Sequence, residues 1–132
     1  MLDVVSENNI KKIIFSSSSE VYGDQDKFPI KEEFEFKVKS NYALSKITSE
    51  FFVSLYANKF NFNFNIVRFF NVYGINQKKN FVIPRFIDQT LKSKNLSVYG
   101  DGTQVRAFCD VRDAARGLFL VMNKGKRNET YN

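Results

Sequence analysis

The apolar positions in the first half of the chain follow two spacings, a short continuous run and then a helical repeat. The run at 12–15 ends in four serines at 16–19, which predicts a buried strand opening into a polar loop. Residues 22–39 contain glycine, proline and many charges, so we expect an irregular connection there. Ser40 is a favourable N-cap for a helix over residues 41–60. The apolar side chains at helical spacing in that helix are Leu44, Ile47, Phe51 and Leu55.

A second run of apolar residues, at 66–70, is again typical of a strand. It is followed by polar residues over 71–80, where we expect a loop. Pro84 suits the first turn of a helix, which should extend to about residue 94.

The last third of the chain has weaker patterns. Residues 96–99 predict a short strand closed by a glycine-containing turn at 100–102, and residues 105–111 a further strand. A helix is expected from Asp113 to near Gly125, followed by the start of another element at Thr130.

The order of these elements predicts an α/β fold, because strands and helices alternate. Such folds have a mainly parallel sheet, and ligands bind beyond the carboxyl ends of its strands. Two changes from apolar to polar lie at such ends, from Phe15 into the serines and from Phe70 into Asn71. Both are therefore candidate positions for a site.

Composition excludes several classes of function. The 132 residues suit one small domain, and no apolar run approaches the roughly 20 residues of a membrane span, so we expect a soluble protein with no membrane partner. The chain has one cysteine and no histidine, which fits a reducing cytoplasm and argues against a metal site. The net charge of +6 is spread along the chain, so we expect no nucleic-acid partner; an acidic small molecule such as a pyrophosphate suits it equally well.

Tyr42 and Lys46 are four residues apart in the predicted helix, so their side chains should share one face. A phenol is a poor base at neutral pH, but a nearby ammonium group favours the phenolate. With a serine hydroxyl from the strand end, the pair could transfer a proton to or from an alcohol while a hydride leaves its carbon. The alternative is an ordinary helix surface on which Lys46 pairs with Glu50.

Four motifs in a fixed order give a more specific indication. They are SSSSEVYG at 16–23, the Tyr-x-x-x-Lys pair at 42–46, RFFNVYG at 68–74 and VYGDGTQVR at 98–106. In this order and spacing they resemble the extended short-chain dehydrogenase/reductase family that modifies nucleotide sugars. UDP-glucose 4-epimerase, dTDP-glucose 4,6-dehydratase and UDP-glucuronate decarboxylase are members of this family.

The resemblance implies NAD as cofactor and a UDP- or dTDP-sugar as substrate. It implies catalytic roles for four residues: Tyr42 as the base, Lys46 as its partner, Ser18 as a hydrogen-bond donor to the sugar oxygen, and Glu20. The implied cofactor contacts are Ser16, Ser17, Tyr42, Lys46 and Phe70, and the implied substrate contacts are Ser18, Asn71, Tyr99 and Arg106. Core packing is an equal alternative for Phe70 and Tyr99. Asp113 matches the start of the following helix, and we expect it to be an N-cap first.

The reaction has three candidates. Glu20 lies where 4,6-dehydratases carry a glutamate, but the residue before it is Ser19 instead of an aspartate. The Ser-Glu pair and the segment at 106–108 resemble nucleotide-sugar decarboxylases, whereas the segments at 42–46 and 68–74 resemble 4-epimerases. We place 4-epimerisation through a transient 4-keto intermediate first, with decarboxylation and 4,6-dehydration as alternatives.

None of the six glycines lies in a G-x-x-G-x-x-G array. The resemblance therefore predicts a partial, Rossmann-type, doubly wound parallel sheet that lacks its N-terminal glycine-loop half, plus part of a small substrate-binding subdomain. Residues 1–80 would carry the catalytic part of the NAD domain and residues 81–132 the partial nucleotide-sugar region. We expect the 132 residues alone to bind NAD poorly and to be inactive. The intact protein could be a homodimer, and the alternative of another class is a non-catalytic binding or assembly module.

Overall fold

The computed structural model describes residues 2–132, which form two compact units. The first unit contains the residues up to Phe70 together with 115–132, and the second contains residues 71–114. Each is described by itself. In chain order the elements are α1 (Leu2–Glu7), β1 (Lys12–Ser18), the 3₁₀ helix η1 (Ser19–Tyr22), α2 (Asn41–Phe60), β2 (Asn63–Phe69), β3 (Asn71–Tyr73), α3 (Val82–Leu91), β4 (Phe108–Asp110), α4 (Val111–Lys124) and β5 (Glu129–Tyr131).

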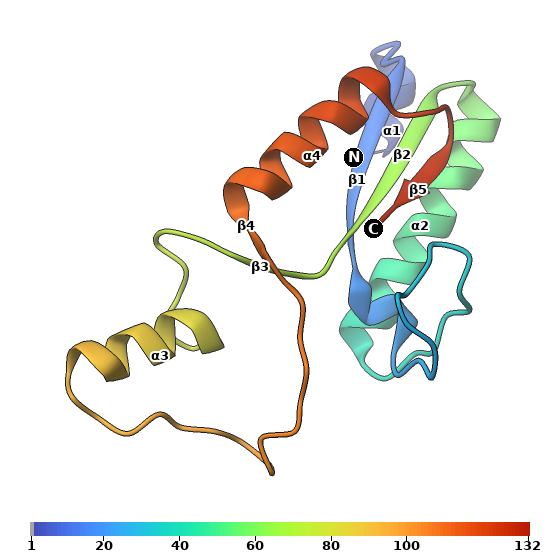
Figure 1. Cartoon of the computed structure of the whole chain (residues 1–132). Coiled ribbons are helices and arrows are strands. Elements are labelled where there is room, and N and C mark those ends of the chain that lie inside the picture. Colours follow the sequence, from blue (N-terminus) through green and yellow to red (C-terminus); the bar gives the residue numbers. More distant parts are fainter. Residues whose placement is uncertain (1) are drawn as a thin grey trace. The chain divides into compact units, whose positions relative to one another are not determined.

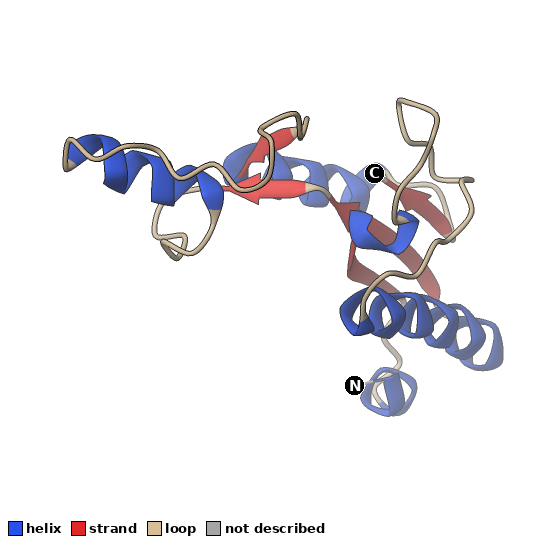
Figure 2. Cartoon of the chain, turned by 90° about the horizontal axis from the view of Figure 1, so that it is seen from below, coloured by secondary structure: helices blue, strands red, loops and turns tan. Residues whose placement is uncertain are grey.

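The first unit is built on a parallel sheet with β2 in the middle, in the order β1-β2-β5 (Figure 1). In the β1–β2 register Ser17 lies opposite Arg68 and Ser18 opposite Phe69. Helices α1 and α2 lie on one side of these strands (Figure 2). The predicted parallel α/β arrangement is therefore confirmed, as is the predicted start of an element at Thr130, which lies in β5.

Helix α2 matches its predicted bounds. The Ser40 side chain accepts a hydrogen bond from the backbone N–H of Ala43 at 3.0 Å, and Asn61 ends the helix in the left-handed conformation. Of the four apolar residues at helical spacing only Ile47 is buried, whereas Leu44, Phe51 and Leu55 are exposed. The buried side chains are instead Ala43, Ile47, Glu50, Val53 and Ala57. Small side chains let the helix backbone approach the sheet closely, and a search for large apolar residues overlooks them.

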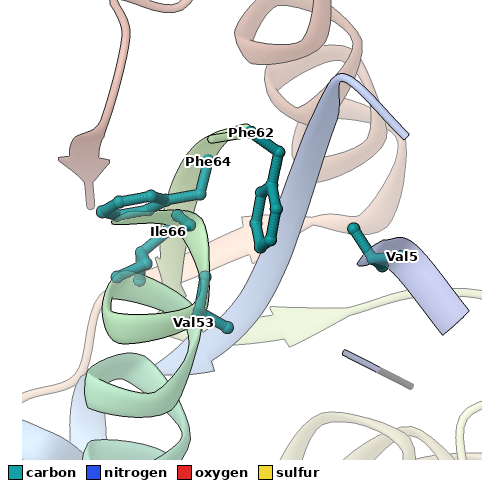
Figure 3. Close-up of a cluster of buried hydrophobic side chains, with 6 residues drawn as sticks. Val5, Val53, Phe62, Phe64 and Ile66 are labelled. Atoms are coloured by element: carbon teal, nitrogen blue, oxygen red, sulfur yellow. The ribbon is translucent and has the colours of Figure 1, made fainter. Parts of the chain in front are cut away.

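The main core lies between the sheet and the two helices α1 and α2. Val5, Val53, Phe62, Phe64 and Ile66 form most of it (Figure 3), together with Ala57. Phe64, Ile66 and Arg68 alternate along β2 with side chains of the opposite face, so all three face α2. Each large apolar side chain buried here contributes about 1.5–3 kcal/mol relative to leaving it exposed.

The second unit departs more from the sequence-based predictions. Residues 71–73 form β3, which pairs in parallel with β4, although a loop was expected there. The strand predicted at 96–99 is wrong, since those residues form an exposed loop without a strand partner. The strand predicted at 105–111 is shortened to β4. Within the described residues, an apolar segment therefore forms a strand only where another segment lies beside it to supply hydrogen-bond partners.

The starts of the last two helices lie within two residues of the predicted positions. Helix α3 begins at Val82, which places Pro84 in its first turn as predicted. Helix α4 begins at Val111 and ends at Lys124, so Asp113 is inside the helix and the N-cap role is wrong for it. Asp110 has that role instead, because its side chain accepts a hydrogen bond from the backbone N–H of Arg112 at 2.8 Å.

Within residues 2–132 no helix combines the length and the apolarity that crossing a membrane requires.

Candidate active site

The carboxyl end of β1 presents two serines with different surroundings. Ser17 follows Ile13 and Phe15 in the alternation of the strand, so its side chain faces α2, where it is 4% exposed. Its hydroxyl oxygen has no hydrogen-bond partner among the described residues. Ser18 caps η1, accepting a hydrogen bond from the backbone N–H of Glu20 at 3.2 Å. Because Ser18 Oγ is the acceptor in this bond, its own proton remains available for donation to a ligand.

Lys46 extends from α2 to the end of β1. Its Nζ donates to the backbone carbonyl of Ser16 at 2.9 Å. The same ammonium lies 5.6 Å from the centre of the Tyr42 ring and 5.2 Å from that of Phe15. The Tyr42 side chain is half exposed, so a ligand could reach it. The structure thus places Tyr42 and Lys46 on one face of α2, beside the serine end of β1.

The alternative pairing of Lys46 with Glu50 is wrong. Glu50 is 5% exposed and receives both of its charged hydrogen bonds from Arg68. Helix geometry separates the two residues by one turn, but Glu50 faces the sheet while Lys46 turns toward the strand end. The ammonium of Lys46 is therefore not neutralised by Glu50.

Glu20 lies in η1 and is tied to the start of α2. Its Oε2 accepts a hydrogen bond from the hydroxyl of Ser40 at 3.1 Å. Ser40 also caps α2, so the Glu20 carboxylate lies beside the positive end of the helix dipole. Glu20 is exposed to solvent, so a ligand could reach it.

Phe70 follows β2 and packs against Val21, Tyr22 and Ile47 in a second apolar cluster. Packing thus explains Phe70, and a contact with the cofactor remains a prediction. The first unit therefore holds seven of the predicted site residues: Ser16, Ser17, Ser18, Glu20, Tyr42, Lys46 and Phe70.

The other three predicted site residues, Asn71, Tyr99 and Arg106, belong to the second unit. The side-chain amide of Asn71 donates to the carbonyl of Ala107 at 3.0 Å, linking β3 to the start of β4. Tyr99 is 71% exposed, so the core-packing alternative is wrong for this residue. The Arg85 guanidinium stacks on the Tyr99 ring, 4.6 Å from the ring centre. Arg106 is exposed and donates to the carbonyl of Val105 at 2.8 Å.

A buried charged cluster in the first unit was not predicted. Arg68 donates through Nε to Glu50 Oε1 at 3.0 Å and through Nη2 to Glu50 Oε2 at 2.6 Å. Its Nη1 donates to the hydroxyl of Tyr22 at 2.7 Å and to the carbonyl of Glu32 at 3.0 Å. The signal in the sequence was a single arginine inside the apolar run at 66–70, since a charge inside a buried strand needs a buried partner.

Burial and hydrogen bonding act in opposite directions on this cluster. Burial disfavours the charged form of Arg68, but the hydrogen bonds to Glu50 and Tyr22 outweigh it and raise the pKa of the guanidinium. Burial raises the pKa of the Tyr22 phenol, although its contacts with Arg68 act to lower it. Arg68 is thus charged and Tyr22 neutral at neutral pH.

No three His, Cys, Asp or Glu side chains gather within the described part of the chain where they could hold a metal ion. The arrangement at the end of β1 is instead that of a hydroxyl, a phenol and an ammonium group, which together suit proton transfer at an alcohol oxygen.

A family model for the NAD dependent epimerase/dehydratase family matches residues 1–132, the whole chain. The chain belongs to this family. This confirms the resemblance to the nucleotide-sugar enzymes, and the Rossmann-like α/β fold agrees with it.

Several relatives in the epimerase/dehydratase family are similar over almost the whole chain. An uncharacterized UDP-glucose epimerase of Bacillus subtilis is 33% identical over 94% of the chain and 39% of its own length. The human dTDP-D-glucose 4,6-dehydratase is 33% identical over 100% of the chain and 38% of its own length. The UDP-N-acetyl-alpha-D-glucosaminuronate decarboxylase of Bacillus cytotoxicus is 37% identical over 92% of the chain and 40% of its own length.

Solved structures of the family agree with this fold. The UDP-N-acetylglucosamine 4-epimerase of Methanobrevibacter ruminantium, in complex with UDP-N-acetylmuramic acid, superposes with a TM-score of 0.92 at 35% identity, covering 98% of this chain and 43% of its own. The UDP-glucuronic acid 4-epimerase of Bacillus cereus, in complex with UDP-glucuronic acid and NAD, gives 0.89 at 30% identity, covering 98% and 41%. The chain thus spans about two fifths of the length of these relatives.

Proposed function

We propose that this chain supplies the proton-transfer part of an NAD-dependent enzyme that modifies a nucleotide-diphosphate sugar, with 4-epimerisation as its reaction. The observation that carries the proposal is the position of Lys46, whose ammonium bonds the Ser16 carbonyl at the end of β1 and lies beside the Tyr42 ring. Membership of the family supports it, because its members include relatives named as epimerases, dehydratases and decarboxylases of nucleotide sugars.

In this proposal Tyr42 accepts the proton of a sugar hydroxyl and later returns it. Its half-exposed phenol can reach a ligand, and the Lys46 ammonium lies 5.6 Å from the centre of its ring. Ser18 donates its free hydroxyl proton to the same sugar oxygen. Each role uses an atom whose bonds in the structure leave it available to a ligand.

The residues at this strand end are suited to the nicotinamide side of NAD. Among the residues that the structure describes, the buried Ser17 hydroxyl oxygen has no hydrogen-bond partner. Lys46 uses one of its three donors for Ser16, which leaves others for a ribose hydroxyl. When bound, NAD supplies the oxidation of the sugar hydroxyl and its later reduction. We propose Ser16, Ser17, Lys46 and Phe70 as the residues that would hold it.

For the sugar nucleotide we propose Asn71, Tyr99 and Arg106 of the second unit. Arg106 is an exposed guanidinium whose fork suits a diphosphate, and Tyr99 presents an open aromatic face. The division into a catalytic part over residues 1–80 and a nucleotide-sugar part over 81–132 belongs to the same proposal. We also propose that the dinucleotide-binding glycine loop lies outside these 132 residues. The intact protein could form a homodimer.

We place epimerisation first because the segments at 42–46 and 68–74 resemble 4-epimerases. Glu20 is the residue that can distinguish epimerisation from the two alternative reactions. A carboxylate in an aqueous setting at the edge of the site would serve a dehydratase as a second base, and the Ser-Glu pair would also suit a decarboxylase. Glu20→Gln should therefore leave 4-epimerisation intact and abolish 4,6-dehydration.

The test uses the chain and a fusion in which it replaces the matched segment of the B. cereus UDP-glucuronic acid 4-epimerase. Both are incubated with NAD and, separately, with UDP-glucose, UDP-glucuronate and dTDP-glucose, and the products are separated by anion-exchange chromatography. We expect UDP-galactose from UDP-glucose in the fusion. A 4-keto-6-deoxy sugar would indicate the dehydratase, and release of carbon dioxide the decarboxylase.

Tyr42→Phe should lower kcat of the fusion by about 10²–10⁴-fold, the usual contribution of a positioned acid–base group. The matched control is Tyr56→Phe, on the same helix but packed against the core and the Phe60 ring. Equal activity of Tyr42→Phe and the unaltered fusion would overturn the role of Tyr42. A fusion that folds but neither binds NAD nor turns over any of the sugars would indicate a non-catalytic module.

A further inference from the structure

The buried cluster around Arg68 has a place in the fold that goes beyond stabilising the core. Arg68 on β2 lies opposite Ser17 of β1. The residue before Ser17 is Ser16, whose backbone carbonyl accepts the hydrogen bond from Lys46. On α2, Glu50 is one helical turn beyond Lys46 and bonds Arg68 through both carboxylate oxygens. The ion pair thus ties α2 to β2, the strand that pairs directly with β1, and β1 carries the Lys46–Ser16 contact.

The same guanidinium also holds the segment that follows β1. It donates to the hydroxyl of Tyr22, the last residue of η1, and to the carbonyl of Glu32. The Tyr22 hydroxyl in turn donates to the side chain of Asn132, and the backbone N–H of Asn132 donates to Glu32 Oε1 at 2.9 Å. Arg68 therefore bonds directly to α2, η1 and the loop at 30–36, and through Tyr22 it is linked to Asn132, the residue after β5.

We propose that Arg68 is a positioning residue, which sets the register of α2 against the carboxyl end of β1 and so holds Lys46 on Ser16 and Tyr42 beside it. The inference rests on the proposed function for its consequence in catalysis, but the geometry it predicts can be measured without turnover. Arg68 touches neither substrate nor cofactor in this proposal and acts through α2.

Three features favour positioning over simple stabilisation. A guanidinium bonded through two nitrogens to one carboxylate fixes both distance and orientation, which a packed apolar pair does not. The side chains of Arg68 and Glu50 are 6% and 5% exposed, so competition from water is small. The guanidinium also stacks on the rings of Tyr22 and Phe36, at 5.0 and 4.8 Å, which restricts its remaining freedom.

The test compares the unaltered chain with the double variant Arg68→Met, Glu50→Leu. Replacing both partners of a buried ion pair by apolar side chains often preserves stability, whereas removing one leaves an unpaired charge. Folding of the double variant is checked by circular dichroism and urea unfolding. Lysines are then acetylated with a limiting amount of acetic anhydride, and the labelling rate of each is measured by mass spectrometry.

We expect Lys46 to be labelled roughly fivefold faster in the double variant, the factor that corresponds to the net contribution of one hydrogen bond. The matched control is Lys12 on β1, which like Lys46 donates to backbone carbonyls, in its case those of Val121 and Met122 in α4. Its labelling rate should stay unchanged. An unchanged rate at Lys46 in a folded double variant would overturn the proposal, as would an equal increase at Lys12, which would indicate general loosening.

Arg68→Lys is the second variant, in case the double variant does not fold. It keeps a positive charge beside Glu50 but lacks the planar fork, so labelling of Lys46 should again increase while Lys12 stays constant. Failure of Lys46 to respond in the folded variant would count against positioning.

Turnover provides the separate readout. In an active fusion the double variant should lower kcat with little change in KM, because no substrate contact is removed. If the unaltered fusion is inactive, the proposed function fails, while the labelling of Lys46 and Lys12 still decides the positioning role of Arg68.

Discussion

Neutralising Glu50 should destabilise the chain far more than the same change at the surface. In Glu50→Gln the side chain keeps its shape and one acceptor oxygen, but the negative charge beside Arg68 is lost. The guanidinium then has neutral acceptors in place of a carboxylate: the glutamine amide oxygen, the Tyr22 hydroxyl and the Glu32 carbonyl, in a site where its side chain is 6% exposed. Removing one partner of a buried ion pair costs about 3–5 kcal/mol, and because glutamine keeps one hydrogen bond we expect the lower end, about 3 kcal/mol.

The assay is urea unfolding followed by circular dichroism. With a denaturant dependence of about 1–3 kcal/mol per molar urea, this loss lowers the midpoint by about 1–3 M. Such a loss is a large part of the roughly 5–15 kcal/mol that stabilises a typical domain, so a stabilising osmolyte is added if the variant is unfolded in buffer.

Glu33→Gln is the matched control, since Glu33 meets Lys31 at 3.9 Å with side chains 70% and 62% exposed. An exposed ion pair of this kind should leave the midpoint unchanged. The reasoning is refuted if both variants shift the midpoint equally, or if Glu50→Gln unfolds where the unaltered chain does.

Four further expectations can be checked on the same material. Ser40→Ala should cost about 1–2 kcal/mol in urea unfolding, because it removes the N-cap of α2, whereas Ser49→Ala inside the helix should cost nothing. Ile66→Ala should cost about 2–5 kcal/mol, since Ile66 is 5% exposed in the main core; a smaller loss would mean that the site collapses around the gap. Burial raises the pKa of Tyr22 above its usual value of 10.0, so the folded state holds the phenol proton more tightly than the unfolded state does. The stability that this protonated phenol contributes is complete below pH 10.0 and is lost as the pH rises above 10.0. Urea midpoints on either side of pH 10.0 should therefore fall less in Tyr22→Phe than in the unaltered chain. Calorimetry should show weaker NAD binding by the 132-residue chain than by the fusion, and equal affinities would contradict the placement of the glycine loop outside it.

The local patterns of the sequence were sufficient for the elements on which the site is built. Ser40 and the residues after it specify α2, because the cap and the helical repeat act within one segment. The run at 12–15 and the serines after it specify β1 and its polar end in the same way. From these two segments the shared face of Tyr42 and Lys46 follows by helix geometry alone, and the four ordered motifs identified the family.

Only the tertiary structure decided which side chains of those elements meet. The buried face of α2 includes Ala43, Ala57 and Glu50 in place of Leu44 and Leu55, because close approach to the sheet favours small residues and Arg68 requires a carboxylate. The strands β3 and β4 exist because each supplies the other with hydrogen-bond partners, whereas residues 96–99 have the composition of a strand but no partner. No local pattern encodes which segments distant in sequence will pair. The burial of charges such as Arg68 and Glu50 depends on that pairing, so it could not be predicted either.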